Sequence, residues 1–196
     1  NEGGSLGYAS ENLQNNQEVV LAAIKNTASA WENVGSKFLQ NSKMIRASVV
    51  DLTGDDADLT RNNYVSAKVF ELFPNDIKSD RTLIMNLLEG DYRIFEFIDE
   101  KLKSDKEFVT QAIASGLNAS NILRFVDKKF RDDKNIAMEA VKTNGWLIGD
   151  VSERLQKDRQ VIEQALKQNG NALRDVHPSM AQDYSIVRFA VESTGS

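Results

Sequence analysis

The side chains best suited to chemistry in this sequence are a single histidine and a short run of aspartates. His177 lies between Val176 and Pro178, and the sequence holds no cysteine and no second histidine. A metal site of the His/Cys type needs several such ligands, and Ser-His-Asp catalysis would depend on His177, near which there is no nucleophile elbow. Glycine-rich phosphate-binding motifs are also missing from the sequence. We therefore expect no catalytic residue and no cofactor, and we predict that the protein is not an enzyme.

The aspartates cluster in the segment DLTGDDADLTRNNY, residues 51–64. Asp55, Asp56 and Asp58 are weak candidates for metal binding, because carboxylate oxygens suit hard cations. Their spacing differs from that of an EF-hand loop, which favours a solvated acidic surface loop or an extra helix. A metal-dependent hydrolase that uses this segment is the least favoured of our functional hypotheses.

A repeat organises the rest of the chain. Large apolar anchor residues recur in steps of 25 residues, with two longer steps, and Asn or Asp follows each anchor three residues later. The anchors are Leu13, Phe38, Ile77, Leu102, Phe130, Leu155 and Met180, and the polar residues are Asn16, Asn41, Asp80, Asp105, Asp133, Asp158 and Asp183. Because a short side-chain oxygen accepts hydrogen bonds from the free N–H groups of a first helical turn, we expect a helix after each of these polar residues.

Apolar residues on both sides of the anchors predict two kinds of helix in each repeat. Pairs spaced by four residues, such as Val161-Ile162 and Ala165-Leu166, predict an apolar stripe on a helix of about 11 residues. Apolar residues seven and four before each anchor, with Pro74 and Pro178 nearby, predict one or two single-turn helices that are partly 3₁₀. Glycines near the ends of the long helices predict left-handed C-terminal caps at Gly90, Gly116, Gly145, Gly170 and Gly195.

One such repeat has no means of burying both stripes alone, so it must stack on its neighbours. We predict an all-α protein, a right-handed superhelical α-solenoid with repeats of about 25 residues. The predicted single array spans residues 1–196. It starts with a partial unit at 1–12 and ends with a partial unit at 180–196, and full units start at residues 13, 38 (with an insertion at about 51–64), 77, 102, 130 and 155. Because the array ends inside a repeat, we expect it to be part of a longer one.

Three stretches, LKSDKEFVTQAI (102–113), NGW (144–146) and DRQVIEQALKQNGNAL (158–173), resemble a helical-repeat domain of unknown function, family 4116. The resemblance is strong for the repeats at Leu13, Leu102, Phe130 and Leu155, and weak for residues 38–76. It implies helices in tandem, in bacterial and some protist proteins, and it brings no catalytic residues. The pattern is also similar to variant leucine-rich repeats, in which α and 3₁₀ helices alternate.

Charge and hydropathy narrow the range of partners. The net charge is −5 and the pI is near 5.0, which argues against binding to nucleic acid or to anionic membranes. No apolar run approaches the roughly 18 residues of a membrane span. We expect a protein that is cytoplasmic or translocated by a bacterial secretion system.

Two rows of side chains are candidates for binding. A basic residue follows the cap in four consecutive repeats, at Arg81, Lys106, Lys134 and Arg159. These cations form either a stripe for an anionic peptide or phosphate group, or a set of charges that neutralise the neighbouring aspartates. The second row lies five residues after the caps and changes chemically from repeat to repeat, as a recognition surface does: Leu21, Arg46, Met85, Thr110, Met138, Glu163 and Arg188.

The functional prediction is a non-enzymatic interaction module that binds a protein or peptide. We expect it to belong to a larger bacterial protein or a host-directed effector, with Met85, Met138 and Arg46 among its binding residues. The alternative is a structural spacer or lid for a catalytic domain absent from this chain. The other interpretation of the second row is that its side chains form the sides of the apolar core between repeats.

Overall fold

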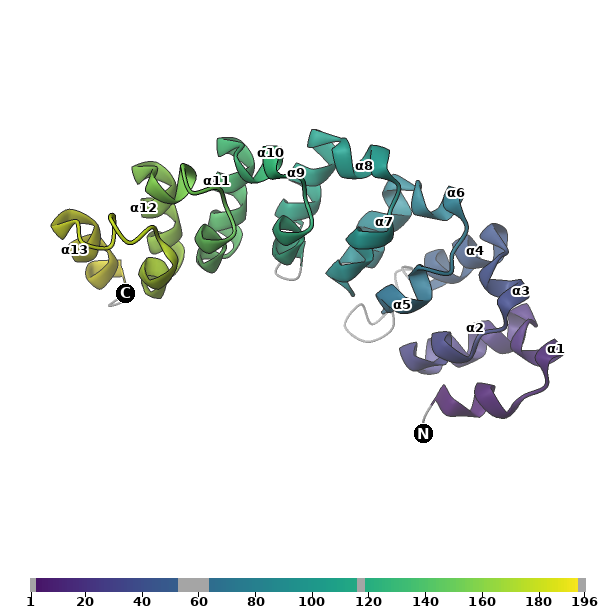
Figure 1. The fold of residues 1–196 in the computed structure, drawn as a ribbon. Helices are drawn as coiled ribbons and strands as arrows, with labels where there is room; N and C mark the ends of the chain where they lie inside the picture. The colour runs from purple at the N-terminus through teal and green to yellow at the C-terminus, as the bar shows by residue number, and fades with distance from the viewer. Residues whose placement is uncertain (1–2, 53–63, 116–118, 194–196) are drawn as a thin grey trace. The chain divides into compact units, whose positions relative to one another are not determined.

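The computed structural model describes residues 3–52, 64–115 and 119–193, and these segments contain helices, turns and no strand (Figure 1). The prediction of an all-α protein is confirmed. The chain divides into two compact units, residues 1–102 and 103–196. Asp55, Asp56 and Asp58, like most of the predicted insertion, lie outside the described residues.

Both units are built from one motif: a short N-terminal helix, usually 3₁₀, then a helix of about one turn, then a long helix. In the first unit the short N-terminal helices are η1 (Gly3–Tyr8), η2 (Ala28–Asn33), α5 (Ala67–Phe70) and η3 (Tyr92–Phe97). The single-turn helices are α1 (Glu11–Gln14), α3 (Ser36–Leu39), α6 (Asn75–Lys78) and α8 (Glu100–Ser104), which runs into the second unit. The long helices are α2 (Gln17–Asn26), α4 (Ser42–Leu52) and α7 (Arg81–Leu88). The predicted broken, partly 3₁₀ segment is confirmed.

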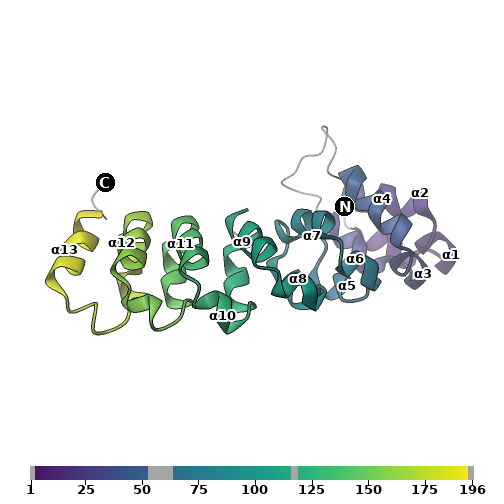
Figure 2. The ribbon, with the colours of Figure 1, turned by 90° about the horizontal axis from the view of Figure 1, so that it is seen from above.

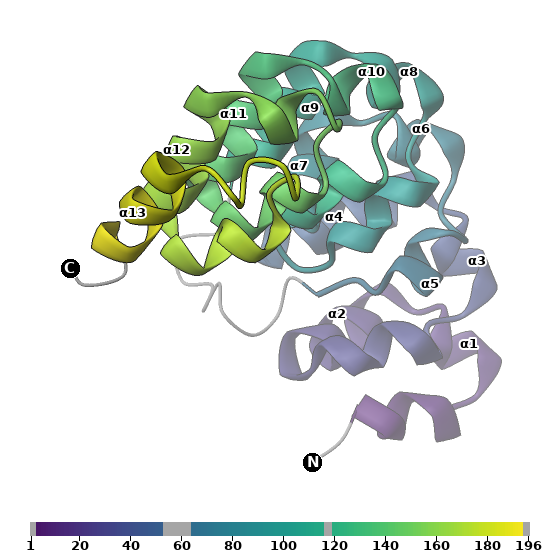
Figure 3. The ribbon, with the colours of Figure 1, turned by 60° about the vertical axis from the view of Figure 1, so that its left-hand side comes forward.

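The second unit continues the motif. Its short N-terminal helices are η4 (Ala119–Arg124), η5 (Gly145–Gly149) and η7 (Gly170–Asp175), and its single-turn helices are α10 (Lys128–Arg131) and η6 (Leu155–Lys157). Its long helices α9 (Lys106–Ala114), α11 (Lys134–Thr143), α12 (Arg159–Gln168) and α13 (Tyr184–Ser193) contact one another in sequence order. Figure 2 shows these four helices side by side, and Figure 3 shows the same order from another direction.

The predicted N-caps are confirmed in all seven repeats. Asp133 Oδ1 accepts from the N–H groups of Asn135 (2.9 Å) and Ile136 (3.4 Å). Equivalent cap bonds form at Asn16, Asn41, Asp80, Asp105, Asp158 and Asp183. Each bond satisfies an N–H that the helix itself leaves free, which stabilises a helix by about 1 kcal/mol.

The apolar stripes that follow the caps form the core. In α11 and α12 all eight stripe residues are fully buried: Ile136, Ala137, Ala140, Val141, Val161, Ile162, Ala165 and Leu166. The anchors Phe38, Ile77 and Leu155 are fully buried as well. Burial of one such large aliphatic or aromatic side chain contributes about 1.5–3 kcal/mol before entropy is subtracted. In the second unit, successive long helices pack on one another, so each repeat there depends on its neighbour for that burial.

The prediction of left-handed glycine caps is wrong for Gly90, Gly145 and Gly170, because no described glycine has a positive φ. Gly116 and Gly195 lie outside the described residues. Helices α11 and α12 end instead on extended asparagines, Asn144 (φ −149°, ψ 108°) and Asn169 (φ −155°, ψ 106°). An extended residue lets the next 3₁₀ helix begin at once, and the asparagine side chains cap those helices.

Gly145 allows the backbones of two successive repeats to approach closely. A Cβ added there would lie 2.5 Å from the carbonyl oxygen of Ala165, in the middle of α12. The Gly145 N–H also donates to Gln168 Oε1 at 2.7 Å. Asn144 therefore caps η5, and Gly145 leaves room for the backbone of the next repeat.

A backbone hydrogen bond recurs between repeats and sets their register. The residue after an anchor accepts from the N–H three residues before the next anchor, in the pairs Gln14–Gly35 (2.8 Å), Lys78–Asp99 (2.9 Å), Arg131–Ser152 (2.9 Å) and Gln156–His177 (3.5 Å). Pro74 occupies the donor position of its repeat and has no N–H. There the Gln40 side-chain amide donates to the carbonyl of Leu72 at 2.7 Å instead.

Candidate functional site

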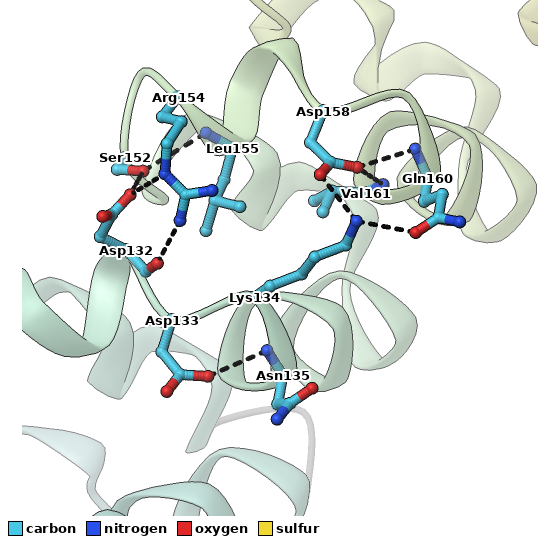
Figure 4. A network of polar contacts seen from close by, with 10 residues as sticks. All are labelled: Asp132, Asp133, Lys134, Asn135, Ser152, Arg154, Leu155, Asp158, Gln160 and Val161. Atoms are coloured by element: carbon cyan, nitrogen blue, oxygen red, sulfur yellow. Dashed lines mark hydrogen bonds and ion pairs between the residues drawn. The ribbon is translucent and has the colours of Figure 1, made fainter.

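A ladder of ion pairs connects the caps of successive repeats in the second unit. Lys106 Nζ lies 2.5 Å from Asp133 Oδ2, and Lys134 Nζ lies 2.7 Å from Asp158 Oδ2. Figure 4 shows Lys134 extended toward Asp158, where it also contacts Gln160 Oε1 at 2.7 Å. Each aspartate therefore holds the start of its own helix and also the lysine of the preceding repeat.

The pKa values of these aspartates reflect this double role. The hydrogen bond from Lys106, together with the cap bonds, holds the pKa of Asp133 below its usual range. Burial raises the pKa of Asp158, but the hydrogen bonds from Lys134 and from the helix N–H groups outweigh that effect and lower it. Both carboxylates are therefore ionised near neutral pH, and their charges are matched by lysines within the array.

The other cations predicted to bind also have partners. Arg159 Nε donates to Glu163 Oε1 at 2.7 Å, one turn along the same helix. Arg46 forms ion pairs with Asp76 and Asp80 of the following repeat. Arg81 is engaged in an interaction as well. Lys106, Lys134 and Arg46 thus pair with aspartates of the next repeat, whereas Arg159 pairs within its own helix.

The second predicted row lies on the flanks of the long helices. Leu21, Met85, Thr110, Met138 and Glu163 are half-buried, as is Arg46, whereas Arg188 is exposed. The adjacent stripe residues are buried in α7, α9, α11 and α12. In the second unit, this position of the repeat has a different chemical character on each of four successive helices: Thr110, Met138, Glu163 and Arg188.

A polar network and a cavity lie beside the ladder, between α10 and the following repeat. Asp132 accepts from the Ser152 hydroxyl and from Arg154 Nε at 3.0 Å, and its carbonyl accepts from Arg154 Nη2 at 2.6 Å (Figure 4). A cavity of about 310 Å³ opens here, lined by Lys128, Arg131, Asp132, Val151 and Ser152. Sequence reasoning did not single out Lys128 or Arg131. The signal that could have found them is a pair of cations in one single-turn helix.

In the first unit, a buried aspartate that the sequence analysis also missed joins two repeats. Asp91 is 3 % exposed, caps η3 by accepting from Arg93 N, and accepts from Ala67 N at 2.9 Å. The Arg93 guanidinium contacts both of its carboxylate oxygens, at 2.8 and 2.9 Å. Burial raises the pKa of Asp91, but these hydrogen bonds outweigh burial and lower it.

A cavity of about 420 Å³ lies beside this pair, and its lining mixes charges of both signs. Glu32, Glu71 and Glu96 face it together with Lys68 and Arg93. Because the lining carries charges of both signs, it matches no single class of charged ligand.

The residues first considered for catalysis form no site in the described part of the chain. His177 Nδ1 lies 2.8 Å from Ser179 Oγ and its Nε2 lies 3.3 Å from Glu153, so it joins a turn to the preceding repeat. Over residues 3–52, 64–115 and 119–193, no three His, Asp or Glu side chains are arranged to hold a metal ion. Within the same ranges, no helix is long and apolar enough to cross a bilayer.

These features define a helical-repeat protein whose repeats are joined by shared cores, backbone hydrogen bonds and cap-to-cap ion pairs. The family model described as "Domain of unknown function (DUF4116)" matches residues 1–39, 80–131, 117–156, 133–181 and 158–196. The chain belongs to this family. The matches leave out residues 40–79, in agreement with the weak resemblance expected for 38–76. Neither the curated proteins nor the solved structures include a match to this chain.

Proposed function

We propose that this protein is a non-enzymatic interaction module that binds a protein or peptide along the flanks of its long helices. The observation that carries the proposal is that one position of the repeat varies in chemical character while the helices around it recur unchanged. In the second unit, Thr110, Met138, Glu163 and Arg188 occupy the same position of successive repeats, although the stripe beside them is uniformly apolar and is buried in α9, α11 and α12. A position that only packs between repeats would be expected to keep one character.

Met85 and Met138 are the residues in this row best suited to contact a partner. Both are half-buried, so each keeps part of its side chain in solvent. The flexible thioether of methionine adapts to differently shaped apolar surfaces. The neighbouring cations are held by carboxylates, so recognition through this row would depend on apolar contact more than on charge.

We also propose that the repeats form a right-handed superhelical α-solenoid. The recurrence of one backbone hydrogen bond in both units supports this arrangement, because equal joints between equal repeats generate a superhelix. A compact globule of this length would have a radius of gyration of about 16 Å. Small-angle scattering should therefore give a clearly larger radius, and a value near that of the globule would contradict the solenoid.

The interaction is tested by partner capture followed by reconstitution. A partner captured from extracts of the source organism is purified, and its dissociation constant for the chain is measured by calorimetry. Met138→Lys should weaken binding by about tenfold or more, which is about 1.4 kcal/mol. Thr143→Lys is the matched control, because Thr143 is also half-buried on α11 but lies on the opposite flank.

The outcome separates the two main hypotheses. Unchanged affinity in both Met85→Lys and Met138→Lys would remove this row from recognition. If no purified protein or peptide binds the chain, the result would favour the alternative, a structural spacer or lid beside a catalytic domain. Membership of a larger bacterial protein, or of a secreted effector, stays a prediction.

A further inference from the structure

The cavity between α10 and the following repeat is lined by an arginine whose guanidinium carries an unsatisfied donor. Lys128, Arg131, Asp132, Val151 and Ser152 line this cavity of about 310 Å³. Arg131 Nε is enclosed by the chain and has no hydrogen-bond partner in the part of the chain that the structure describes. Buried N–H groups are nearly always satisfied, so Arg131 is not held by the polar contacts that fix an ordinary structural arginine.

Arg131 also departs from the role that its position has in other repeats. In three of them the residue after the anchor donates, through its side chain, to the carbonyl six residues before the anchor. The bonds run from Gln14 to Gly7 (3.3 Å), from Lys78 to Glu71 (2.6 Å) and from Gln156 to Gly149 (3.2 Å). No such bond from the Arg131 side chain occurs among the described residues.

The cavity carries two positive charges that the chain leaves unmatched. Lys128 and Arg131 are three residues apart on one helical turn, so their side chains share a face. Neither forms an ion pair with any residue in the described ranges. Asp132 is already committed to Ser152 and Arg154, whose hydrogen bonds lower its pKa. The Ser152 hydroxyl donates to Asp132 and accepts from Leu155 N, so it is occupied as well.

This pair of cations is particular to one repeat. The residue two before the anchor and the residue one after it are both basic only around Phe130. The corresponding pairs are Glu11/Gln14, Ser36/Leu39, Asn75/Lys78, Glu100/Lys103, Glu153/Gln156 and Pro178/Ala181. The packing of the repeat therefore does not require two cations here.

We propose that this cavity binds a phosphoryl dianion, either inorganic phosphate or the phosphate of a monoester. The Arg131 guanidinium would donate to one oxygen and the Lys128 ammonium would pair with another. A tetrahedral dianion matches both charges from two directions, whereas a single carboxylate would leave one cation unmatched. None of the flank row lines the cavity, so this site is separate from the surface proposed above for a protein partner.

The Arg131 guanidinium gives a direct readout. In the ¹⁵N-labelled chain, the Arg131 Nε–Hε signal is identified by its loss in Arg131→Lys. Inorganic phosphate, O-phosphoserine and acetate are then titrated at matched ionic strength. We expect phosphate to move this signal downfield to saturation and acetate to leave it in place. An equal response to phosphoserine identifies the monoester as an accepted ligand, and a response to phosphate alone identifies the free anion.

Two lysine variants separate a built site from general electrostatic attraction. Lys128→Gln should weaken phosphate binding by about fivefold to tenfold, since it removes one of two charge-assisted contacts. Lys129→Gln removes the same charge one residue away, outside the cavity lining, and should change affinity by less than about twofold. Lys128 is exposed, so its variant is expected to fold even if a variant of Arg131 does not.

Three results would overturn the proposal: an Nε–Hε signal that neither phosphate nor phosphoserine moves, an equal shift with acetate, or equal effects of Lys128→Gln and Lys129→Gln. Met138→Lys should leave the phosphate titration unchanged. Failure of the protein-binding surface and failure of this cavity are therefore observed separately.

Discussion

Gly145→Ala tests directly whether close backbone approach joins the repeats. The added Cβ would lie 2.5 Å from Ala165 O and 3.0 Å from Gln168 Oε1, where ordinary contact begins at 3.4 Å. Relief requires a shift of about 0.9 Å between η5 and α12, and the Ala165 carbonyl is fixed within its helix. Overpacking of this kind costs about 1–3 kcal/mol. Displacement of the Gly145–Gln168 hydrogen bond adds about 0.5–1.5 kcal/mol.

We therefore expect Gly145→Ala to lower the free energy of unfolding by about 1.5–4.5 kcal/mol. Urea unfolding followed by circular dichroism at 222 nm gives this value. Amide hydrogen exchange should show lost protection in η5 and α12 and unchanged protection in α2. Gly4→Ala is the control, because the added Cβ would meet no atom within 4 Å. It should be neutral or stabilising by up to about 1 kcal/mol. Equal unfolding midpoints for the two variants would refute the argument.

Two further predictions concern charged groups. Asp91→Asn should cost about 1–3 kcal/mol at neutral pH, because a buried charge-assisted network is lost. Since folding lowers the pKa of Asp91, its contribution is present above the unfolded value of about 3.9 and is lost as pH falls through the folded value. Urea titrations should show wild type and variant converging below about pH 4, and a constant difference would contradict this assignment. Lys134→Met should cost less than about 1 kcal/mol, because the pair with Asp158 is partly solvated. The cost should shrink further in 1 M salt, and a larger, salt-insensitive cost would show that the ladder does more than match surface charge.

The helices and their starting points could be predicted from the sequence because they depend on local spacing. An Asn or Asp directly before an apolar pair sets a cap, and pairs four residues apart set one face of a helix. That is why all seven caps, Asn16 to Asp183, and the buried stripe of α12 match the prediction. The alternation of long helices with broken, partly 3₁₀ segments follows from the same local signals.

The glycine prediction failed because a glycine has two uses that look identical in sequence. The position after a helix suggested a left-handed cap, but Gly145 is small because Ala165 of the next repeat approaches it. The basic residues after the caps were equally ambiguous. Whether Lys106 and Lys134 face solvent or a neighbouring aspartate depends on how closely two repeats approach.

The period, the helices, their caps and the apolar faces can be predicted from the sequence, because each depends on residues within a few positions of one another. Which charges are matched, and where a buried donor lacks a partner, depends on how the repeats pack. Ser152 and Arg131, or Lys134 and Asp158, are more than 20 residues apart and meet only when one repeat packs on the next. The cavity at Arg131 exists because stacking brings a single-turn helix against the start of the following repeat, and no local pattern encodes that distance.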